Sequence, residues 1–191
     1  LEKAGILKAV ITQNIDDLHQ RACSSAVYEV HGSLRSMICP HCHETFPTRQ
    51  FRAAIEEPAD LPHCPNCDRV LKPQITLYGE LLPEDTWSAA EEHCRQADVI
   101  LIAGSSLLVW PAAGLLEIGL DHGAHLIINN LTPTHLDINA AVRIHLNVAE
   151  VEHLAGVGHS PPEDRADSRQ QFPGSKRLDH VVVGADCEPA D

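Results

Sequence analysis

The sequence predicts an α/β protein built on a doubly wound parallel sheet. Short apolar runs rich in branched residues stand at 8–12, 98–103 and 124–129, as is typical of strands buried on both faces of such a sheet. Helix-like stretches alternate with these runs, and each run is followed by small polar residues. Because ligands bind at the carboxyl ends of parallel strands, the polar residues mark the edge where a site is expected.

The helix-like stretches span 15–22, 83–97 and 110–123. The second has a proline and acidic residues in its first turn, which suits the positive end of the helix dipole. The third ends at Gly123, which resembles a C-cap. Strand and helix therefore alternate along the chain, the order that produces a parallel sheet.

The charge balance is strongly acidic: 14 Lys and Arg stand against 27 Asp and Glu, a formal net charge of −13. A phosphate backbone is bound by clustered cations, so we expect no nucleic-acid partner. No apolar run approaches the ~18 residues of a membrane span, and the first residues lack the order of a signal peptide. We expect a cytoplasmic protein with no membrane partner, and the oligomeric state stays open.

Composition divides the chain into three parts. A block framed by cysteines, 37–69, breaks the alternation and is expected to be a small inserted module. Beyond about residue 156 the chain is polar and rich in Pro and Gly, with one short apolar run, "HVVVGA", so 156–191 is expected to be a disordered tail. The remaining segments, 1–36 and 70–155, are expected to form the α/β domain.

Two Cys-x-x-Cys pairs, Cys39 with Cys42 and Cys64 with Cys67, predict a zinc site. Four thiolates complete the tetrahedral shell and leave no position for substrate, so the zinc is expected to be structural. A histidine in place of one thiolate is an alternative, because three stand beside the pairs: His41, His43 and His63. The other cysteines, Cys23, Cys94 and Cys187, are expected to be ordinary small side chains.

Polar residues follow all three strand-like runs. Gln13, Asn14 and Asp16 follow the first; Gly104, Ser105 and Ser106 the second; Asn130 the third. Taken alone, Asn14 or Asp16 is favoured as the N-cap of the next helix. Taken together, these residues suit a nucleotide lying across the sheet edge.

The succession "TQNIDDLH", "EVHG", "CPHC…CPNC", "LYGELLP", "GSSLLVWP" and "INNLTPT", in this order, resembles the sirtuins, the NAD-dependent protein lysine deacylases. The resemblance covers residues 1 to about 155. It implies a Rossmann-type NAD domain, a small zinc-binding module, and a cleft between them that takes an acyl-lysine protein or peptide opposite NAD.

The resemblance also implies roles for individual residues. His31 matches the catalytic histidine, although a histidine before glycine at a strand end is by itself more typical of a structural residue; imidazole titrates near neutrality and suits a general base. The implied NAD-binding set is Asn14 and Asp16 at nicotinamide, Gln13 at its ribose, Gly104, Ser105 and Ser106 at ribose and phosphates, Asn130 at the adenosine ribose, and the backbone near Val148 at adenine.

The implied peptide site lies in "ITLYGELLP". Ile75 and Tyr78 would wall the acyl-lysine tunnel, and Gly79, Glu80 and Leu81 would offer backbone to the peptide as an added strand. Plain core packing is the alternative for Tyr78. In the implied reaction, the acyl oxygen of the substrate attacks the nicotinamide ribose as nicotinamide leaves, which gives an alkylamidate. His31 then acts as general base on a ribose hydroxyl that attacks this intermediate, and free lysine and O-acyl-ADP-ribose are the further products.

The chain departs from the family pattern at three places. Cys23 stands at a usual glycine and is strained if the position needs a positive φ. Tyr78 stands where phenylalanine is usual. No Gly-rich phosphate loop precedes Leu1, so we expect an N-terminally incomplete sheet and a half-built NAD site. The alternatives to a deacylase are an inactive zinc-containing binding module, a mono-ADP-ribosyltransferase, and a zinc-ribbon nucleic-acid binder, which the charge disfavours.

Overall fold

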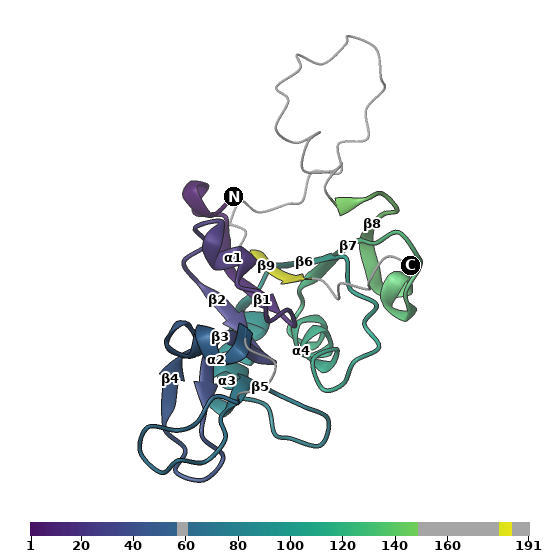
Figure 1. Cartoon of the computed structure of the whole chain (residues 1–191). Coiled ribbons are helices and arrows are strands. Elements are labelled where there is room, and N and C mark those ends of the chain that lie inside the picture. Colours follow the sequence, from purple (N-terminus) through teal and green to yellow (C-terminus); the bar gives the residue numbers. More distant parts are fainter. Residues whose placement is uncertain (57–60, 149–179, 185–191) are drawn as a thin grey trace, which may run out of the picture.

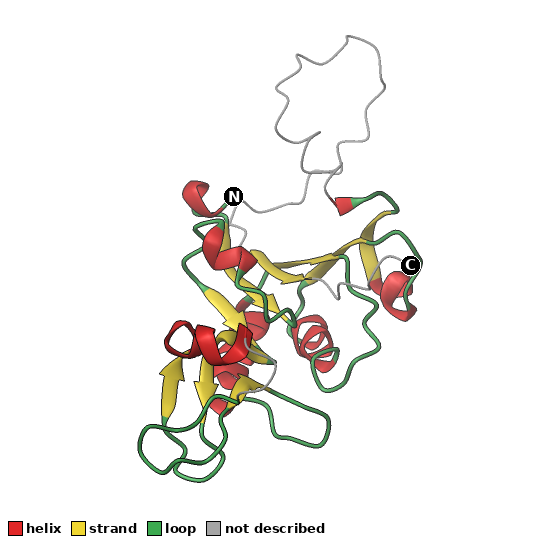
Figure 2. Ribbon diagram, in the orientation of Figure 1, coloured by secondary structure: helices red, strands yellow, loops and turns green. Residues whose placement is uncertain are grey.

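A computed structural model describes residues 1–56, 61–148 and 180–184, and it contains two sheets (Figures 1 and 2). A six-stranded parallel sheet has the order β2-β1-β9-β6-β7-β8, and a three-stranded antiparallel sheet has the order β4-β3-β5. The strands are β1 (Leu7–Thr12), β2 (Val27–Glu29), β3 (Gly32–Ile38), β4 (Thr45–Pro47), β5 (Lys72–Ile75), β6 (Val99–Ala103), β7 (His125–Asn129), β8 (Ala140–Ile144) and β9 (His180–Gly184).

The three strands predicted from apolar runs are confirmed as β1, β6 and β7, and the doubly wound parallel sheet is confirmed with them. Their branched side chains, Ile11, Ile100 and Ile128 among them, are fully buried. Two further strands gave no such signal. β2 is short, and the central residues of the edge strand β8 are exposed, so neither carries an apolar run.

The helical segments are η1 (Glu2–Ala4), α1 (Leu18–Arg21), η2 (Thr48–Phe51), α2 (Arg52–Glu56), α3 (Glu84–Gln96), α4 (Gly114–Asp121) and η3 (His135–Asn139). Helix α3 matches its prediction closely, whereas α1 and α4 are shorter than expected. Asp17 takes a left-handed conformation, with φ 61°, so α1 starts only after it. Among the described helices, none combines the length and apolar character needed to cross a membrane.

Helices α3 and α4 pack on the large sheet and close its core. Cys94 of α3 and Leu115 and Leu116 of α4 are fully buried there. Burial raises the pKa of the Cys94 thiol to about 12, so this cysteine is a core side chain, as predicted. Cys187 lies outside the described residues.

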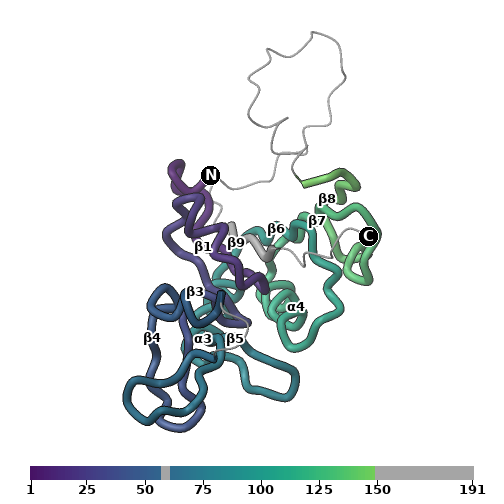
Figure 3. Tube along the Cα trace, in the orientation of Figure 1, coloured from purple at the N-terminus to yellow at the C-terminus, as the bar shows by residue number. Residues whose placement is uncertain are grey.

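The small sheet forms the cysteine module, which lies to one side of the large sheet (Figure 3). Its core contains Met37, Leu71 and two of the cysteines, and Phe46 packs against them. The sheet begins at Gly32 and ends at Ile75, so the module is wider than the predicted 37–69. Strand β3 follows β2 of the large sheet directly, and this short connection joins the two units.

The predicted disordered tail is corrected at 180–184, which form β9 in the middle of the large sheet (Figure 1, yellow). Val182 is in register with Val10 of β1 on one side and with Leu101 of β6 on the other. A branched apolar run suits this central position, because the inner strands of a parallel sheet are covered on both faces. Its backbone also gives β1 and β6 the hydrogen-bonding partner that their facing edges need. The sheet is thus continuous from β2 to β8, whereas missing strands were expected. Val148 is the last described residue before β9, and the rest of 156–191 lies outside the described residues.

The strain expected at Cys23 is confirmed, since this residue follows α1 with φ 68°. Its side chain is exposed, so little packing depends on it. We expect Cys23→Gly to raise the free energy of unfolding by about 0.5–1 kcal/mol, because glycine adopts positive φ without a steric cost. Urea denaturation measures the change, with Cys23→Ala as the control that keeps the strain. Equal stability of the two variants would contradict the prediction.

Candidate active site

His31 lies in the turn between β2 and β3, where the two sheets meet. The preceding residue, Val30, is fully buried, and its N–H donates to the carbonyl of Thr12 at 3.0 Å. The carbonyl of His31 itself accepts a hydrogen bond from the N–H of Thr76 at 2.8 Å. The turn is therefore tied to the end of β1 on one side and to the segment after β5 on the other, and the imidazole is half-buried.

Gly32 explains why glycine follows the histidine. Its φ is 81°, and a Cβ at this position would lie 2.2 Å from the carbonyl oxygen of Gln74 on β5. Both the backbone conformation and the close approach of β5 exclude any side chain. The His-Gly pair is thus required by the way β3 begins against β5.

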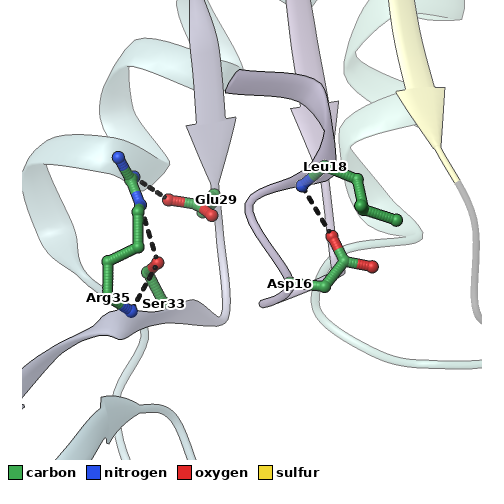
Figure 4. A network of polar contacts seen from close by, with 5 residues as sticks. All are labelled: Asp16, Leu18, Glu29, Ser33 and Arg35. Atoms are coloured by element: carbon green, nitrogen blue, oxygen red, sulfur yellow. Dashed lines mark hydrogen bonds and ion pairs between the residues drawn. The ribbon is translucent and has the colours of Figure 1, made fainter. Parts of the chain in front are cut away.

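A charged network surrounds the same turn (Figure 4). Arg35 Nη2 lies 2.5 Å from Glu29 Oε2, and Arg35 Nε donates to Ser33 Oγ at 3.1 Å. The Glu29 side chain is only 9% exposed. Because Glu29 precedes His31 and the other two residues follow it, the network links the two strands that hold the histidine.

Two cavities meet at His31. The first, of about 540 Å³, is lined by the loop 76–82 and by 109–111; the second, of about 390 Å³, is lined by Asn14, Ile15, Asp16 and Ile75. Gln13, His31 and Thr76 line both cavities. The histidine therefore stands where a molecule in one cavity would meet a molecule in the other.

Gln13 presents an unpaired polar atom to this boundary. The residue is 7% exposed, and its Oε1 has no hydrogen-bond partner among the described residues. An unsatisfied buried acceptor costs about 1–3 kcal/mol, which a ligand hydroxyl or amide would offset by donating to it. This side chain thus has the position and the free acceptor that a ligand-binding residue needs.

Asn14 and Asp16 lie together on the wall of the second cavity, and their predicted role at nicotinamide stays a prediction. Asp16 Oδ1 also accepts a hydrogen bond from the N–H of Leu18 at 3.0 Å (Figure 4). One oxygen of Asp16 therefore binds the N–H of a first-turn residue of α1, as a capping side chain would. The N-cap position itself is Asp17, whose side chain makes no capping hydrogen bond. Asp16 lies in the cavity wall and orders the start of α1.

The loop after β5 forms the wall of the first cavity. The N–H of Glu80 donates to the carbonyl of Leu77 at 3.0 Å, and Gly79 has φ 86°, as the third residue of a type II turn requires. Lys72 Nζ donates to the Glu80 carboxylate at 2.5 Å, and this bond is the main reason that the pKa of Glu80 is lowered. Glu80 thus fixes the loop through its side chain.

Tyr78 and Leu81 project from this loop and are almost completely exposed. Plain core packing of Tyr78 is therefore wrong. Both residues line the first cavity together with Gly79 and Glu80, whereas Ile75 lines the second. The predicted tunnel residues are thus divided between the two cavities, with His31 between them.

The loops after β6 and β7 are locked to one another at the sheet edge. Asn130 Oδ1 accepts from the N–H of Ser105 at 3.0 Å, and Asn130 Nδ2 donates to the Ser105 carbonyl. The N–H of Gly104 donates to the Asn129 carbonyl at 3.0 Å. Asn130 therefore holds the loop that carries the predicted phosphate contacts, and its own amide is already occupied.

The remaining predicted nucleotide contacts lie outside the two cavities. Gly104, Ser105 and Ser106 follow β6, and Val148 follows β8 as a half-buried residue. Their roles at ribose, phosphate and adenine stay predictions. Conversely, Thr76 and Trp110 line the first cavity without having been assigned. Both stand inside the quoted motifs, and the one signal that the sequence offered was an aromatic residue, Trp110, close after the polar residues that follow β6.

The four predicted zinc ligands lie together in the small sheet, with their sulfur atoms all within 4.8 Å of one another. The two Cys-x-x-Cys turns are alike: the N–H of His43 donates to the Cys39 carbonyl, and the N–H of Asp68 donates to the Cys64 carbonyl, each at 2.9 Å. A backbone hydrogen bond from Cys42 is the main cause that lowers the pKa of the Cys39 thiol to about 6. At Cys42, a backbone hydrogen bond from Glu44 lowers the pKa of the thiol, but burial and the neighbouring sulfurs outweigh it and raise this pKa to about 12.

Four sulfurs in this arrangement fit a structural zinc ion. No histidine belongs to the cluster among the described residues, and His63 is instead hydrogen-bonded through Nδ1 to the Asp68 carbonyl at 2.8 Å. The alternative of a histidine ligand is therefore wrong. The metal would hold together the module whose first and last strands support His31.

Comparison with known proteins identifies relatives of this chain. The family model described as the Sir2 family matches residues 1–111. An NAD-dependent protein deacetylase of Caldivirga maquilingensis is 43% identical over 154 residues, which are 81% of this chain and 59% of the relative. NAD-dependent protein deacylase 2 of Archaeoglobus fulgidus is 43% identical over 79% of this chain and 60% of its own length.

The solved structures agree with these relatives. A structure described as Sir2 with a p53 peptide and NAD⁺ has a TM-score of 0.76 and 37% identity, over 81% of this chain and 64% of that one. The chain thus spans about 60% of the length of the curated relatives it matches.

Removal of the metal is expected to unfold the small sheet, because structural zinc contributes about 10–16 kcal/mol in small metal-bound domains. Cys64→Ala should lose the zinc, about one ion per chain, that elemental analysis is expected to find in the unaltered protein. Cys23→Ala serves as the control, since Cys23 lies outside the cluster. Full zinc content in Cys64→Ala would contradict the assignment of the site.

Arg35→Gln is expected to lower the free energy of unfolding by about 1–3 kcal/mol, because it leaves the buried Glu29 carboxylate without its cation. Urea denaturation measures this, and Glu29→Gln combined with Arg35→Gln should recover most of the loss. Arg52→Gln is the matched control: its ion pair with Glu56 is exposed on both sides and should contribute below about 0.5 kcal/mol. Equal losses in the two arginine variants would show that the network does not stabilise the turn.

Proposed function

Because the chain belongs to the Sir2 family, we propose that it removes acetyl or other acyl groups from protein lysines in an NAD-dependent reaction, with nicotinamide and O-acyl-ADP-ribose as products. The observation that carries this proposal is the position of His31 and Gln13 on the wall common to two cavities. An acyl transfer between two bound substrates needs both to reach the same catalytic group.

We assign the second cavity to the nicotinamide end of NAD. Asn14 and Asp16 offer amide and carboxylate atoms there, which suit the carboxamide of nicotinamide. The free Oε1 of Gln13 would accept a hydrogen bond from a ribose hydroxyl and so orient the sugar. NAD supplies the electrophilic ribose carbon that the substrate's acyl oxygen attacks, and the protein's contribution is to hold this carbon beside His31.

We assign the first cavity to the acyl-lysine peptide. The turn at 77–80 is held by Lys72 and Glu80, so its backbone needs no large rearrangement to meet an extended peptide. The exposed rings of Tyr78 and Trp110 give this cavity apolar walls, which suit the alkyl chain of an acylated lysine. Main-chain hydrogen bonds to a peptide accept many side-chain sequences.

His31 acts in this proposal as the general base. The imidazole is half-buried, and the backbone carbonyl of His31 is fixed by the N–H of Thr76, so the side chain has a defined position between the two cavities. An imidazole placed there suits a general base that takes a proton from a ribose hydroxyl. The network of Glu29 and Arg35 keeps the turn in place during this step. Zinc is assigned a structural role only, because four thiolates complete its shell.

We also propose a cytoplasmic location. The support is the cluster of four cysteines with sulfurs arranged for a metal, which needs reduced thiols and therefore suits a reducing compartment.

His31→Ala is expected to lower the rate of O-acetyl-ADP-ribose formation by about 10²–10⁴-fold, the contribution typical of a general base. The assay incubates the zinc-loaded chain with NAD and an acetyl-lysine peptide and detects the product by mass spectrometry. His135→Ala is the matched control, because His135 is exposed on η3 and lines neither cavity.

Three outcomes would redirect the proposal. Full activity in His31→Ala would contradict the mechanism. An ADP-ribosylated peptide in place of the free lysine product would assign a mono-ADP-ribosyltransferase. Peptide binding by the unaltered chain, with no turnover and no affinity for NAD, would assign an inactive binding module.

A further inference from the structure

Strand β9 stands where the strand order of the large sheet reverses. From β9, the order continues through β1 and β2 on one side, and through β6, β7 and β8 on the other. In doubly wound sheets a dinucleotide lies across the sheet edge at this reversal, outside the carboxyl ends of the strands. The topology therefore places the last residues of β9 at the centre of the edge that binds nucleotide.

The register shows which residue reaches that edge. Gly184, the last residue of β9, is paired with Thr12 on β1 and with Ala103 on β6. Thr12 is followed at once by Gln13, and Ala103 by Gly104. Gly184 thus lies between the loop of Gln13, whose Oε1 has no partner among the described residues, and the loop of Ser105, which is hydrogen-bonded to Asn130.

The residue type fits the place. At the carboxyl end of the strand at the reversal, a glycine lets the backbone approach a pyrophosphate, because no Cβ stands between them. Neighbouring strands instead end in Thr12 and Ala103, which carry side chains. The Oε1 acceptor of Gln13 follows β1 on one side of this point, and the loop that begins at Gly104 follows β6 on the other side.

We propose that the carboxyl end of β9 forms part of the dinucleotide site, with the backbone of Gly184 against the pyrophosphate of NAD. This inference rests on the proposed function. It assigns a binding role to a segment that follows the zinc module and the catalytic turn in the sequence, inside the stretch for which no role was predicted. The C-terminal strand then both joins the two halves of the sheet and completes the nucleotide site.

The test uses the full chain and measures the Kd for NAD, for ADP-ribose and for an acetyl-lysine peptide by titration calorimetry. We expect Gly184→Val to raise the Kd for NAD and for ADP-ribose at least about tenfold, because a branched side chain blocks the approach of the phosphates. The Kd for the peptide should stay within about twofold. Ala141→Val, at an exposed position on the edge strand β8, is the matched control and should leave all three values unchanged.

Unchanged affinity of Gly184→Val for NAD and ADP-ribose would overturn this inference and leave the proposed function standing. Failure of the unaltered chain to bind either nucleotide would overturn both. If the valine variant loses its thermal unfolding transition, Gly184→Ala and hydrogen exchange on the unaltered chain decide. NAD should slow exchange of the backbone amides in 180–184, and exchange at the same rate with and without NAD would overturn the inference.

Discussion

The close approach of β3 and β5 at Gly32 is the contact on which the rest of the site depends. With the Gln74 carbonyl 2.2 Å from where a Cβ would lie, only glycine allows the two strands to pair there. This pairing brings Thr76 within hydrogen-bonding distance of the His31 carbonyl. One backbone contact therefore fixes the histidine, the start of the module and the loop that forms the wall of the first cavity.

The cysteine module supports this contact from its other end. Strands β3 and β5 are the first and last strands of the small sheet, and the four cysteines lie between them in sequence. A zinc ion bound by the four cysteines would hold the module's core, which is too small to rely on apolar burial alone. The metal would support the candidate active site only through the strands it keeps paired, because four thiolates leave it no open position for a substrate.

Hydrogen bonding separates the polar residues of the sheet edge into two kinds. Asn130 uses both atoms of its amide on the Ser105 backbone, so it builds the loop. Gln13 is just as buried, and its Oε1 has no partner within the part of the chain that the structure describes, so it offers an acceptor to a ligand. Residues of the same chemical type, following parallel strands of one sheet, thus take different roles because only one of them is satisfied within the protein.

The sequence by itself determined the buried strands and the metal-binding turns. Runs of branched apolar residues predict buried strands such as β1 and β6, and Cys-x-x-Cys pairs predict metal-binding turns, because both patterns depend on residues close together in the chain. The order of the motifs further indicated the family and, within it, His31 as the candidate catalytic histidine. Only the tertiary structure decided the features that depend on segments distant in sequence. Gln13 and His31 both line the two cavities, and both amide atoms of Asn130 are hydrogen-bonded to Ser105. Residues 180–184 lie between β1 and β6. A short apolar run at the end of a polar segment predicts no partner, because the partners of a parallel strand lie far away in sequence and are chosen only when the sheet assembles.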